Sequence, residues 1–186
     1  GANGYLIDAF LRRSSNHRDD QYGGSQENRI RFLVEVAEAV AAEVGADRTG
    51  IRMSPYITQR NMADEEIIEV MLKAASELNR IGLAYIHLSE ADWDDSPQIP
   101  SEFRVELRKT FGNTIIATGN KTPEEAEQLL GADLVDLVGF GRNFLTNPDY
   151  PRRLELGAPL NEISDTHTLF GGGGATGYTD YPFLDS

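Results

Sequence analysis

The feature that most constrains the fold is a regular alternation of short apolar runs with longer amphipathic segments. Apolar residues at helical spacing predict helices over residues 25–45, 64–80, 100–111, 122–131 and about 147–156. Short apolar runs between them predict strands at 49–54, 83–88, 114–117 and 135–139. Strands that alternate with helices form a parallel sheet with right-handed crossovers, so an α/β fold is expected.

The number of strand–helix units limits the possible architectures. Four units are roughly half of what an eight-unit barrel of ~250 residues requires. A helix comes first, as though an earlier strand were missing, and length alone leaves two alternatives: a small open doubly wound sheet, or half a barrel. The strands are apolar on both faces, which is typical of a sheet covered by helices.

Composition excludes several classes of function. The chain has 186 residues, with 30 acidic against 17 basic side chains and a net charge of −13. Such a surface repels phosphate backbones and anionic lipid, so neither nucleic acid nor a membrane is an expected partner. There is no cysteine, and the three histidines lack the spacing of metal ligands, so no disulfide or metal site is expected. With no signal peptide and no apolar run of ~18 residues, we expect a cytoplasmic protein.

Glycines follow the last two predicted strands. Gly119 and Asn120 come after one strand, and Gly141 and Arg142 come after the next. Glycine lets backbone N–H groups approach an anion closely, a helix N-terminus adds a favourable dipole, and Arg142 would add a charge-assisted contact. Either turn alone is more simply a tight connection. Together they favour a phosphate site like the one that barrels form after their last two strands.

Other residues suggest a ligand less directly. Arg52 lies in an apolar strand, where a buried guanidinium is costly unless paired, so it either forms an ion pair or faces a ligand. Asn3 and Tyr5 place an amide and a phenol two residues apart, and a tyrosine with pKa ~10 can donate a proton at neutral pH. His87, on a strand, is better explained as a core or rim histidine than as a base. The run of four glycines at 171–174 is typical of a flexible linker.

A series of motifs then identifies a family. The chain contains Gly1-Ala-Asn-Gly-Tyr-Leu, Asp20-Gln-Tyr-Gly-Gly-Ser, Gly50-Ile-Arg-Met-Ser-Pro, Thr118-Gly-Asn, Phe140-Gly-Arg, Asn147-Pro-Asp and Gly177-Tyr-Thr-Asp-Tyr-Pro. These motifs, in this order and over essentially the whole chain, resemble the old yellow enzymes, and among them the N-ethylmaleimide, nitroester and morphinone reductases. The resemblance implies the carboxyl-terminal half of a (β/α)8 TIM barrel, strands five to eight with their helices. Residues 1–186 would form one partial FMN-binding domain, with a substrate loop at 1–24, the half barrel at 25–156 and a tail at 157–186.

The resemblance also implies roles for single residues. Tyr5 matches the proton donor to the substrate α-carbon, and Asn3 matches one of two donors to the substrate oxygen. Arg52 matches the arginine beside the flavin N1/O2 edge. The residues that match the FMN phosphate site are Gly119, Asn120, Gly141 and Arg142. Phe170 resembles an aromatic residue near the flavin, which would make the glycine run an ordered lid.

The activity so implied is reduction of an activated alkene, such as an enone, a maleimide or a nitro compound. NAD(P)H would reduce FMN, the flavin N5 would give a hydride to the β-carbon, Asn3 would polarise the oxygen and Tyr5 would supply a proton.

The chain departs from the family pattern in ways that bear on this activity. The histidine of the family's His-x-x-Asn pair would directly precede Gly1, the first four strands are missing, and Asp19 stands where threonine is usual. Half a barrel exposes strand edges and an apolar face, so we expect a need for the missing half-barrel or self-association. The alternatives are a non-catalytic half-barrel that binds phosphate ligands or self-assembles, and a self-contained open-sheet phosphate binder.

Overall fold

The computed structural model describes residues 1–58, 61–90 and 98–184. They form two compact units, the first made of residues 1–119 and 124–139 and the second of residues 120–123 and 140–186. None of the described helices is both long enough and apolar enough to cross a bilayer.

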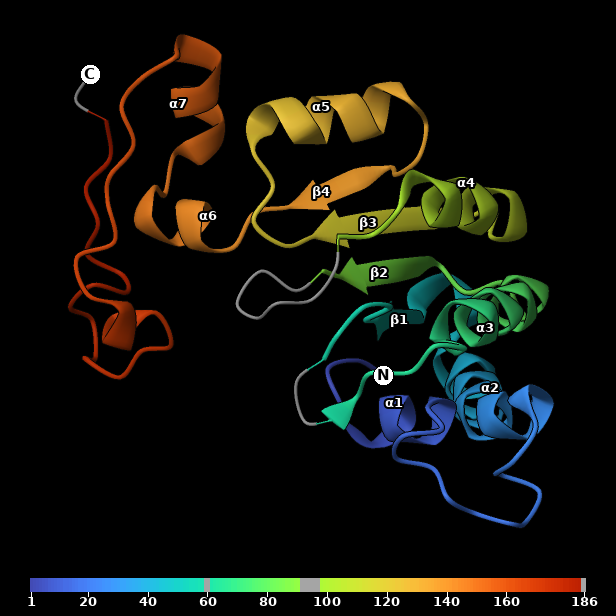
Figure 1. The fold of residues 1–186 in the computed structure, drawn as a ribbon. Coiled ribbons are helices and arrows are strands. Elements are labelled where there is room, and N and C mark those ends of the chain that lie inside the picture. The colour runs from blue at the N-terminus through green and yellow to red at the C-terminus, as the bar shows by residue number, and fades with distance from the viewer. Residues whose placement is uncertain (59–60, 91–97, 185–186) are drawn as a thin grey trace. The chain divides into compact units, whose positions relative to one another are not determined.

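The first unit contains a parallel sheet of four strands in the order β1-β2-β3-β4 (Figure 1). The strands are β1 (Gly50–Met53), β2 (Tyr85–Ser89), β3 (Thr114–Thr118) and β4 (Leu137–Gly139). Ile86 is the common register partner of Ile51 in β1 and Ile115 in β3, and Ala117 pairs with Val138. Strands that neighbour one another in chain order are what successive strand–helix units produce, so the predicted parallel α/β fold is confirmed.

Four helices of this unit begin and end close to the predicted residues, and a fifth, α1, was not predicted. They are α1 (Leu6–Leu11), α2 (Gln26–Val44), α3 (Ile67–Ile81), α4 (Ser101–Thr110) and α5 (Pro123–Gly131), with a 3-10 turn, η1, at Ala46–Arg48. The Ser25 hydroxyl caps α2 by accepting from the Asn28 amide at 3.2 Å, and Gly45 ends that helix. The apolar stripe predicted for α2 is buried only as far as Ala37, because Val40 and Val44 are exposed.

One face of the sheet carries the hydrophobic core. Ile86, Leu88, Ile115 and Ala117 are almost fully buried, and so are the facing residues of α3, which include Met71 and Leu78. Figure 1 shows α2 to α5 arranged along this face. Full burial of one such large side chain contributes about 1.5–3 kcal/mol, so this side of the sheet holds the unit together.

The opposite face of the sheet is not covered by the described helices of the first unit. Successive side chains of a strand point to opposite faces, and Arg52, Tyr85 and Leu137 are exposed here, whereas His87 and Thr118 are half-buried. One exposed face is what half a barrel is expected to leave, although here it carries polar side chains. The polar side chains and the exposed side chains of the four strands all lie on this one face.

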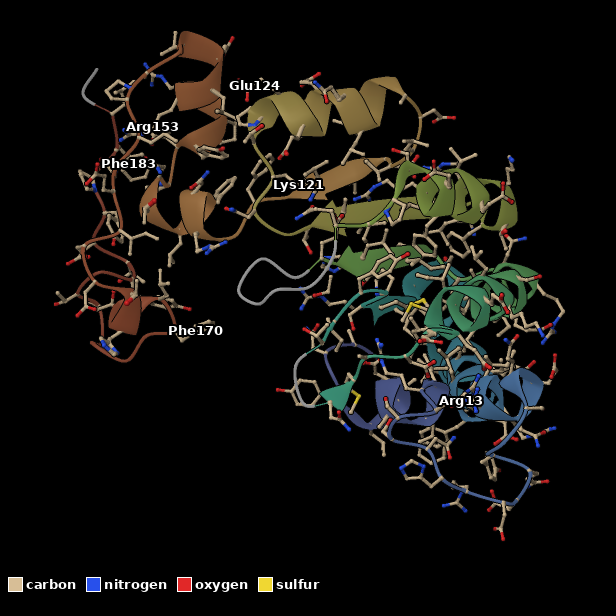
Figure 2. The ribbon with its side chains drawn as sticks, in the orientation of Figure 1. Arg13, Lys121, Glu124, Arg153, Phe170 and Phe183 are labelled. Carbon is tan, nitrogen blue, oxygen red and sulfur yellow. The ribbon has the colours of Figure 1, made fainter. Side chains whose placement is uncertain are left out.

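The second unit is built around two short helices, α6 (Arg142–Thr146) and α7 (Tyr150–Leu156), and a 3-10 turn, η3, at Thr166–Thr168. Arg153, labelled in Figure 2, is buried on α7 and forms an ion pair with Asp149 at 2.7 Å. Its other nitrogens donate to the carbonyls of Pro159 and Pro182 at 2.6 and 3.0 Å. One guanidinium thus ties the tail to α7. Helix α7 lies within the predicted segment, whereas α6 was not predicted.

The glycine run forms an ordered turn. The Gly171 amide donates to the Thr168 carbonyl at 2.9 Å, and the Gly174 amide donates to the Gly171 carbonyl at 3.1 Å. The buried Thr168 hydroxyl lies 3.0 Å from the Gly177 carbonyl. These bonds hold the run between two fixed points, so the interpretation of this segment as a flexible linker is wrong.

Candidate functional site

The Asn3-Gly4 dipeptide forms a tight turn at the carboxyl ends of β1 and β2. The Tyr5 amide donates to the Ala2 carbonyl at 3.2 Å, and the central residues Asn3 and Gly4 have φ of 57° and 75°. Positive φ at both central positions is the pattern of a type I′ turn, for which Asn-Gly is the favoured sequence. The local sequence therefore specifies the conformation that presents Asn3.

Two serines hold Asn3 to the ends of the strands. The Asn3 amide donates to the hydroxyl of Ser54, which directly follows β1, at 2.8 Å. The hydroxyl of Ser89, the last residue of β2, donates to Asn3 Oδ1 at 3.3 Å. Both serines are buried. Ser89 thus holds Oδ1 of Asn3, and Nδ2 is the side-chain atom that can donate to an oxygen.

Tyr5 directly precedes helix α1 and has an extended backbone. Its side chain is 63% exposed, so the phenol is accessible two residues from Asn3. The turn thus places an asparagine and an exposed tyrosine two residues apart in the first unit, and their shared role at one site stays a prediction.

Arg52 differs from the sequence expectation. It lies in the middle of β1, but its side chain is exposed on the uncovered face of the sheet and forms no ion pair with a described residue. The prediction of a buried guanidinium is wrong because residue 52 points away from the helices. Exposure removes the need for a structural partner, and the interpretation that Arg52 faces a ligand stays a prediction.

His87 is the register partner of Arg52 on the same face. Its Nε2 lies 3.0 Å from Thr118 Oγ1, and that hydroxyl donates to the Leu88 carbonyl at 2.9 Å. The single hydroxyl proton is therefore used, and Nε2 must be the donor in the contact with Thr118. Burial, and to a lesser extent the charge of Arg52, lower the pKa of His87. His87 is a hydrogen-bonded rim histidine that favours its neutral form.

Gly119 follows β3 and has a structural reason to be glycine. Its φ is +122°, and a methyl group added there would lie 2.3 Å from the Glu90 carbonyl oxygen. Thr118 and Gly139, the last residues of β3 and β4, are register partners, so these two strands end side by side. Gly119 is thus needed for the close approach of the chain segments that follow β2 and β3, and this reason for glycine is independent of any ligand.

The second glycine turn, in the second unit, has a different character. Gly141 is exposed with φ −88°, and a methyl group added there would meet nothing within 4 Å. Arg142, the next residue, is exposed, and Asn120 of the same unit adopts a left-handed φ of 40°. Helix α6 has only five residues, so its dipole adds less than the sequence analysis expected. Among the residues that the structure describes, none would contact a methyl side chain at 141, so packing does not explain the glycine there.

Phe170 lies immediately before the glycine turn of the second unit (Figure 2). Its side chain is 94% exposed. An aromatic ring with this exposure contributes little to packing in the unit, so the structure provides no packing role for it. Its predicted proximity to the flavin stays a prediction.

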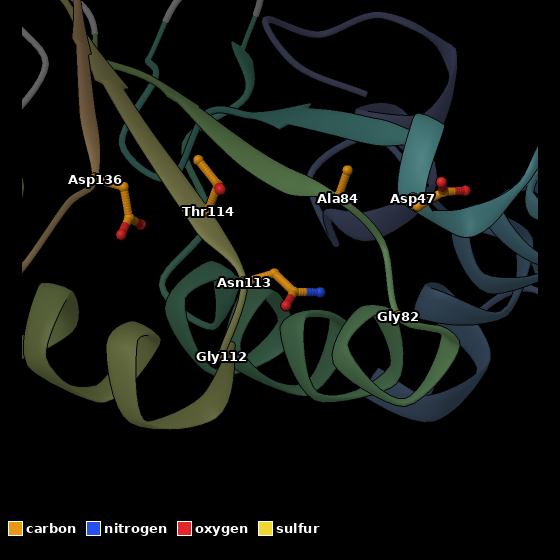
Figure 3. A pocket seen from close by; sticks show the side chains of 7 residues that line it. All are labelled: Asp47, Gly82, Ala84, Gly112, Asn113, Thr114 and Asp136. Carbon is orange, nitrogen blue, oxygen red and sulfur yellow. The ribbon is translucent and has the colours of Figure 1, made fainter.

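A polar pocket in the first unit lies at the opposite end of the sheet (Figure 3). Its lining residues precede or begin the strands and include Asp47, Asn113 and Asp136. Burial raises the pKa of Asp136, but bonds from Arg108 at 2.6 Å and from the Ile115 amide outweigh it and lower the pKa. The amino-terminal ends of barrel strands serve stability, so this pocket is not the candidate site.

Sequence reasoning did not single out four residues that organise the site. Ser54 and Ser89 could have been found as polar residues at the carboxyl ends of predicted strands. Asp8 and Arg12 lie four residues apart on α1 and are fully buried. Their helical spacing was the only sequence signal, because a pattern of apolar residues does not detect buried charged residues.

The amino-acid sequence of the chain matches a known protein family. Residues 1–161 match the model of the NADH:flavin oxidoreductase / NADH oxidase family. Putative 12-oxophytodienoate reductase 3 of Oryza sativa subsp. japonica is 47% identical over 189 residues, which are 100% of this chain and 49% of that protein. 12-oxophytodienoate reductase 2 of Arabidopsis thaliana is 40% identical over 188 residues, covering 100% of this chain and 50% of that protein.

Solved structures give the same result. Morphinone reductase superposes with a TM-score of 0.91 at 44% identity, over 100% of this chain and 49% of that one. The old yellow enzyme homologue from Zymomonas mobilis gives 0.88 at 39% identity, over 98% of this chain and 52% of that one. The chain spans about half the length of the relatives it matches. By sequence and by fold, it belongs to the NADH:flavin oxidoreductase / NADH oxidase family, the family of the old yellow enzymes.

Proposed function

We propose that this chain forms strands five to eight of a (β/α)8 barrel that binds FMN and reduces activated alkenes. The observation that carries the proposal is the Asn3–Tyr5 turn. The donor end of an amide and an accessible phenol lie two residues apart, at the carboxyl ends of β1 and β2, where Ser54 and Ser89 hold the amide. Barrel enzymes place their active sites at this end of the strands.

The residues present fit an anionic flavin nucleotide. Arg52 offers an exposed guanidinium on the uncovered sheet face, and Arg142 offers another beside the open Gly141. Arginine forms bidentate contacts with phosphate, and a backbone without a side chain can approach one closely. We assign Arg142, Gly141, Gly119 and Asn120 to the phosphate and Arg52 to the flavin ring edge. When bound, FMN would supply the hydride that adds to the alkene.

The residues of this chain would act on the other atoms of the substrate. The Asn3 Nδ2 group donates to the carbonyl or nitro oxygen, where negative charge develops during the reaction. The Tyr5 phenol then gives its proton to the α-carbon and completes the addition. Enones, maleimides and nitroalkenes share this activated double bond, and NADH or NADPH would be the reductant.

The uncovered sheet face needs a partner for this function. Arg52, Tyr85 and Leu137 are exposed on it, and in the described sheet β1 and β4 each pair on one side only. We propose that a complementary half-barrel covers this face and completes the flavin site. A second copy of the chain is the competing occupant. A monomer at high concentration that unfolds in one two-state transition would contradict both.

Co-expression of this chain with the amino-terminal half of a family member tests the proposal. The expected result is a yellow complex that consumes NADH or NADPH and removes an enone. The absence of bound flavin in a well-folded complex would refute the FMN proposal. Bound flavin without alkene reduction would retain the binding role and refute the roles of Asn3 and Tyr5.

A further inference from the structure

The Asn3–Tyr5 turn is supported by a buried ion pair. Asp8 and Arg12 lie at i and i+4 along α1, with Arg12 Nε and Asp8 Oδ1 3.0 Å apart, and both side chains are fully buried. Burying two charges costs several kcal/mol each, and apolar residues of similar size are often at least as stable. A contribution to stability alone therefore does not explain why charges occupy these positions.

Each remaining polar group of the pair binds a backbone atom of a different segment. Asp8 Oδ2 accepts from the Gly4 amide, inside the turn, at 2.8 Å. Arg12 Nη1 donates to the Met62 carbonyl at 2.8 Å, and Nη2 donates to the Ser54 carbonyl at 2.5 Å. The pair thus connects the turn, the end of β1 and the segment that leads into α3.

Ser54 links this network to the functional amide. Arg12 fixes the Ser54 carbonyl, and the Ser54 hydroxyl accepts from the Asn3 amide at 2.8 Å. Asp8 fixes the next amide, that of Gly4. Two consecutive backbone N–H groups of the turn are therefore held, directly or through one serine, by a single ion pair.

We propose that Asp8 and Arg12 are positioning residues that lock the Asn3-Gly4-Tyr5 turn in its substrate-binding conformation. The catalytic purpose of this lock rests on the proposed function, but the lock itself can be tested without flavin or alkene. Charge-assisted hydrogen bonds to a carboxylate are about twice as strong as neutral ones, so losing Asp8 should free the Gly4 amide first.

Deamidation of Asn3 reports on that amide. Asn3 is the only asparagine in the chain that is followed by glycine. In this reaction the deprotonated Gly4 nitrogen attacks the Asn3 side-chain carbonyl carbon, a C–N bond forms and ammonia leaves. Water then opens the cyclic imide to aspartate or isoaspartate, which peptide mass spectrometry detects. A Gly4 N–H bound to Asp8 and an Asn3 side chain held by Ser89 oppose the attack, so the rate measures how firmly the turn is held.

The experiment compares Asn3 deamidation in the intact chain and in three variants. Asp8→Ala should raise the rate about tenfold or more, because a hydrogen bond to a charged group is lost. Asp8→Asn should give an intermediate rate. Asp8 accepts from the Gly4 amide and from Arg12 Nε, and an asparagine side chain can accept only one of these bonds because its NH2 group would face the other donor. Asp149→Ala is the matched control and should leave the rate unchanged. Asp149 also pairs with an arginine four residues later, Arg153, and binds a backbone amide, that of Leu184.

Circular dichroism shows whether each variant remains folded. If Asp8→Ala unfolds, Asp8→Asn carries the test, and a rate equal to that of the unmodified chain overturns the proposal. An equal increase in Asp149→Ala would also overturn it, because the effect would then be general loosening. A flavin-free chain that shows the expected order of rates supports the lock even if alkene reduction is never found.

Discussion

Two turns that each present a glycine beside a candidate ligand-binding residue are built in different ways. The Asn3-Gly4 turn of the first unit is held by Ser54, Ser89 and Asp8, all buried. The Gly141-Arg142 turn of the second unit is exposed, with open space beside Gly141. The difference teaches that the scaffold holds the Asn3-Gly4 turn without a ligand, whereas on the proposed function we expect phosphate to order the Gly141-Arg142 turn.

The largest expected effect comes from Tyr5→Phe, in the flavin-loaded protein. Removing the exposed phenol should slow alkene reduction about 10²- to 10⁴-fold, the usual contribution of a general acid, and leave flavin reduction unchanged. Stopped-flow measurement of the two half-reactions checks this. Equal slowing of both would mean that the turn serves the flavin and not the alkene.

Alanine substitutions at the glycines after β3 and β4 separate a glycine needed for folding from one needed for ligand binding. Gly119→Ala should cost about 2–5 kcal/mol of unfolding free energy, because φ is +122° and the methyl group would meet Glu90. Gly141→Ala should change stability by less than about 0.5 kcal/mol, yet weaken FMN binding. Urea titration and flavin retention measure the two effects. A large loss of stability in Gly141→Ala would contradict the open turn.

Arg142→Ala should weaken FMN retention about 10- to 100-fold, since a hydrogen bond to a charged group contributes about 1.5–3 kcal/mol. Arg152→Ala is the matched control, because Arg152 is also exposed in the second unit and its removal changes the net charge equally. Flavin release on dilution provides the measurement. Identical retention of FMN in the two variants would mean that Arg142 acts only through its long-range charge and does not contact the phosphate.

The smallest expected effect is the pH dependence of His87. Burial and Arg52 lower its pKa in the folded chain, so the unfolded chain binds the proton more readily. The stability contribution is complete above the unfolded pKa of about 6.5 and is lost as the pH falls through the lower folded value. His87→Gln should therefore lose less stability than the unmodified chain between neutral and acidic pH, as followed by urea titration. An equal loss in both proteins would show that ionisable groups other than His87 cause the loss of stability at acidic pH.

The sequence predicted the long elements better than the short ones. Helix α2 was found from apolar residues at helical spacing between Ser25 and Gly45, both of which act as caps in the structure. Helices α1 and α6 have six and five residues, too few to establish a period, and the buried residues of α1 include a charged one, Asp8. Pattern reasoning depends on apolar burial, so a short helix with a polar buried face escapes it.

The candidate site was predictable as residue types but not as a network. The spacing of Asn3 and Tyr5 and the place of Arg52 in a strand marked them as candidates, and the family resemblance implied their roles. The exposure of Arg52 did not follow, because an apolar run does not reveal which face the helices leave open. The support from Asp8 and Arg12 depends on contacts with Ser54 and Met62, more than 40 residues away in the chain. Such long-range backbone contacts have no local sequence signal.

Amide hydrogen exchange at Gly4 and Gly141, measured with and without FMN, tests the central contrast most directly. The chain would be studied in the complex with an amino-terminal half-barrel, by NMR of selectively labelled glycine. We predict slow exchange of the Gly4 amide in both states, and fast exchange of the Gly141 amide that slows only when FMN is bound. A Gly4 amide that becomes protected only with FMN, or a Gly141 amide that does not respond to FMN, would contradict the account.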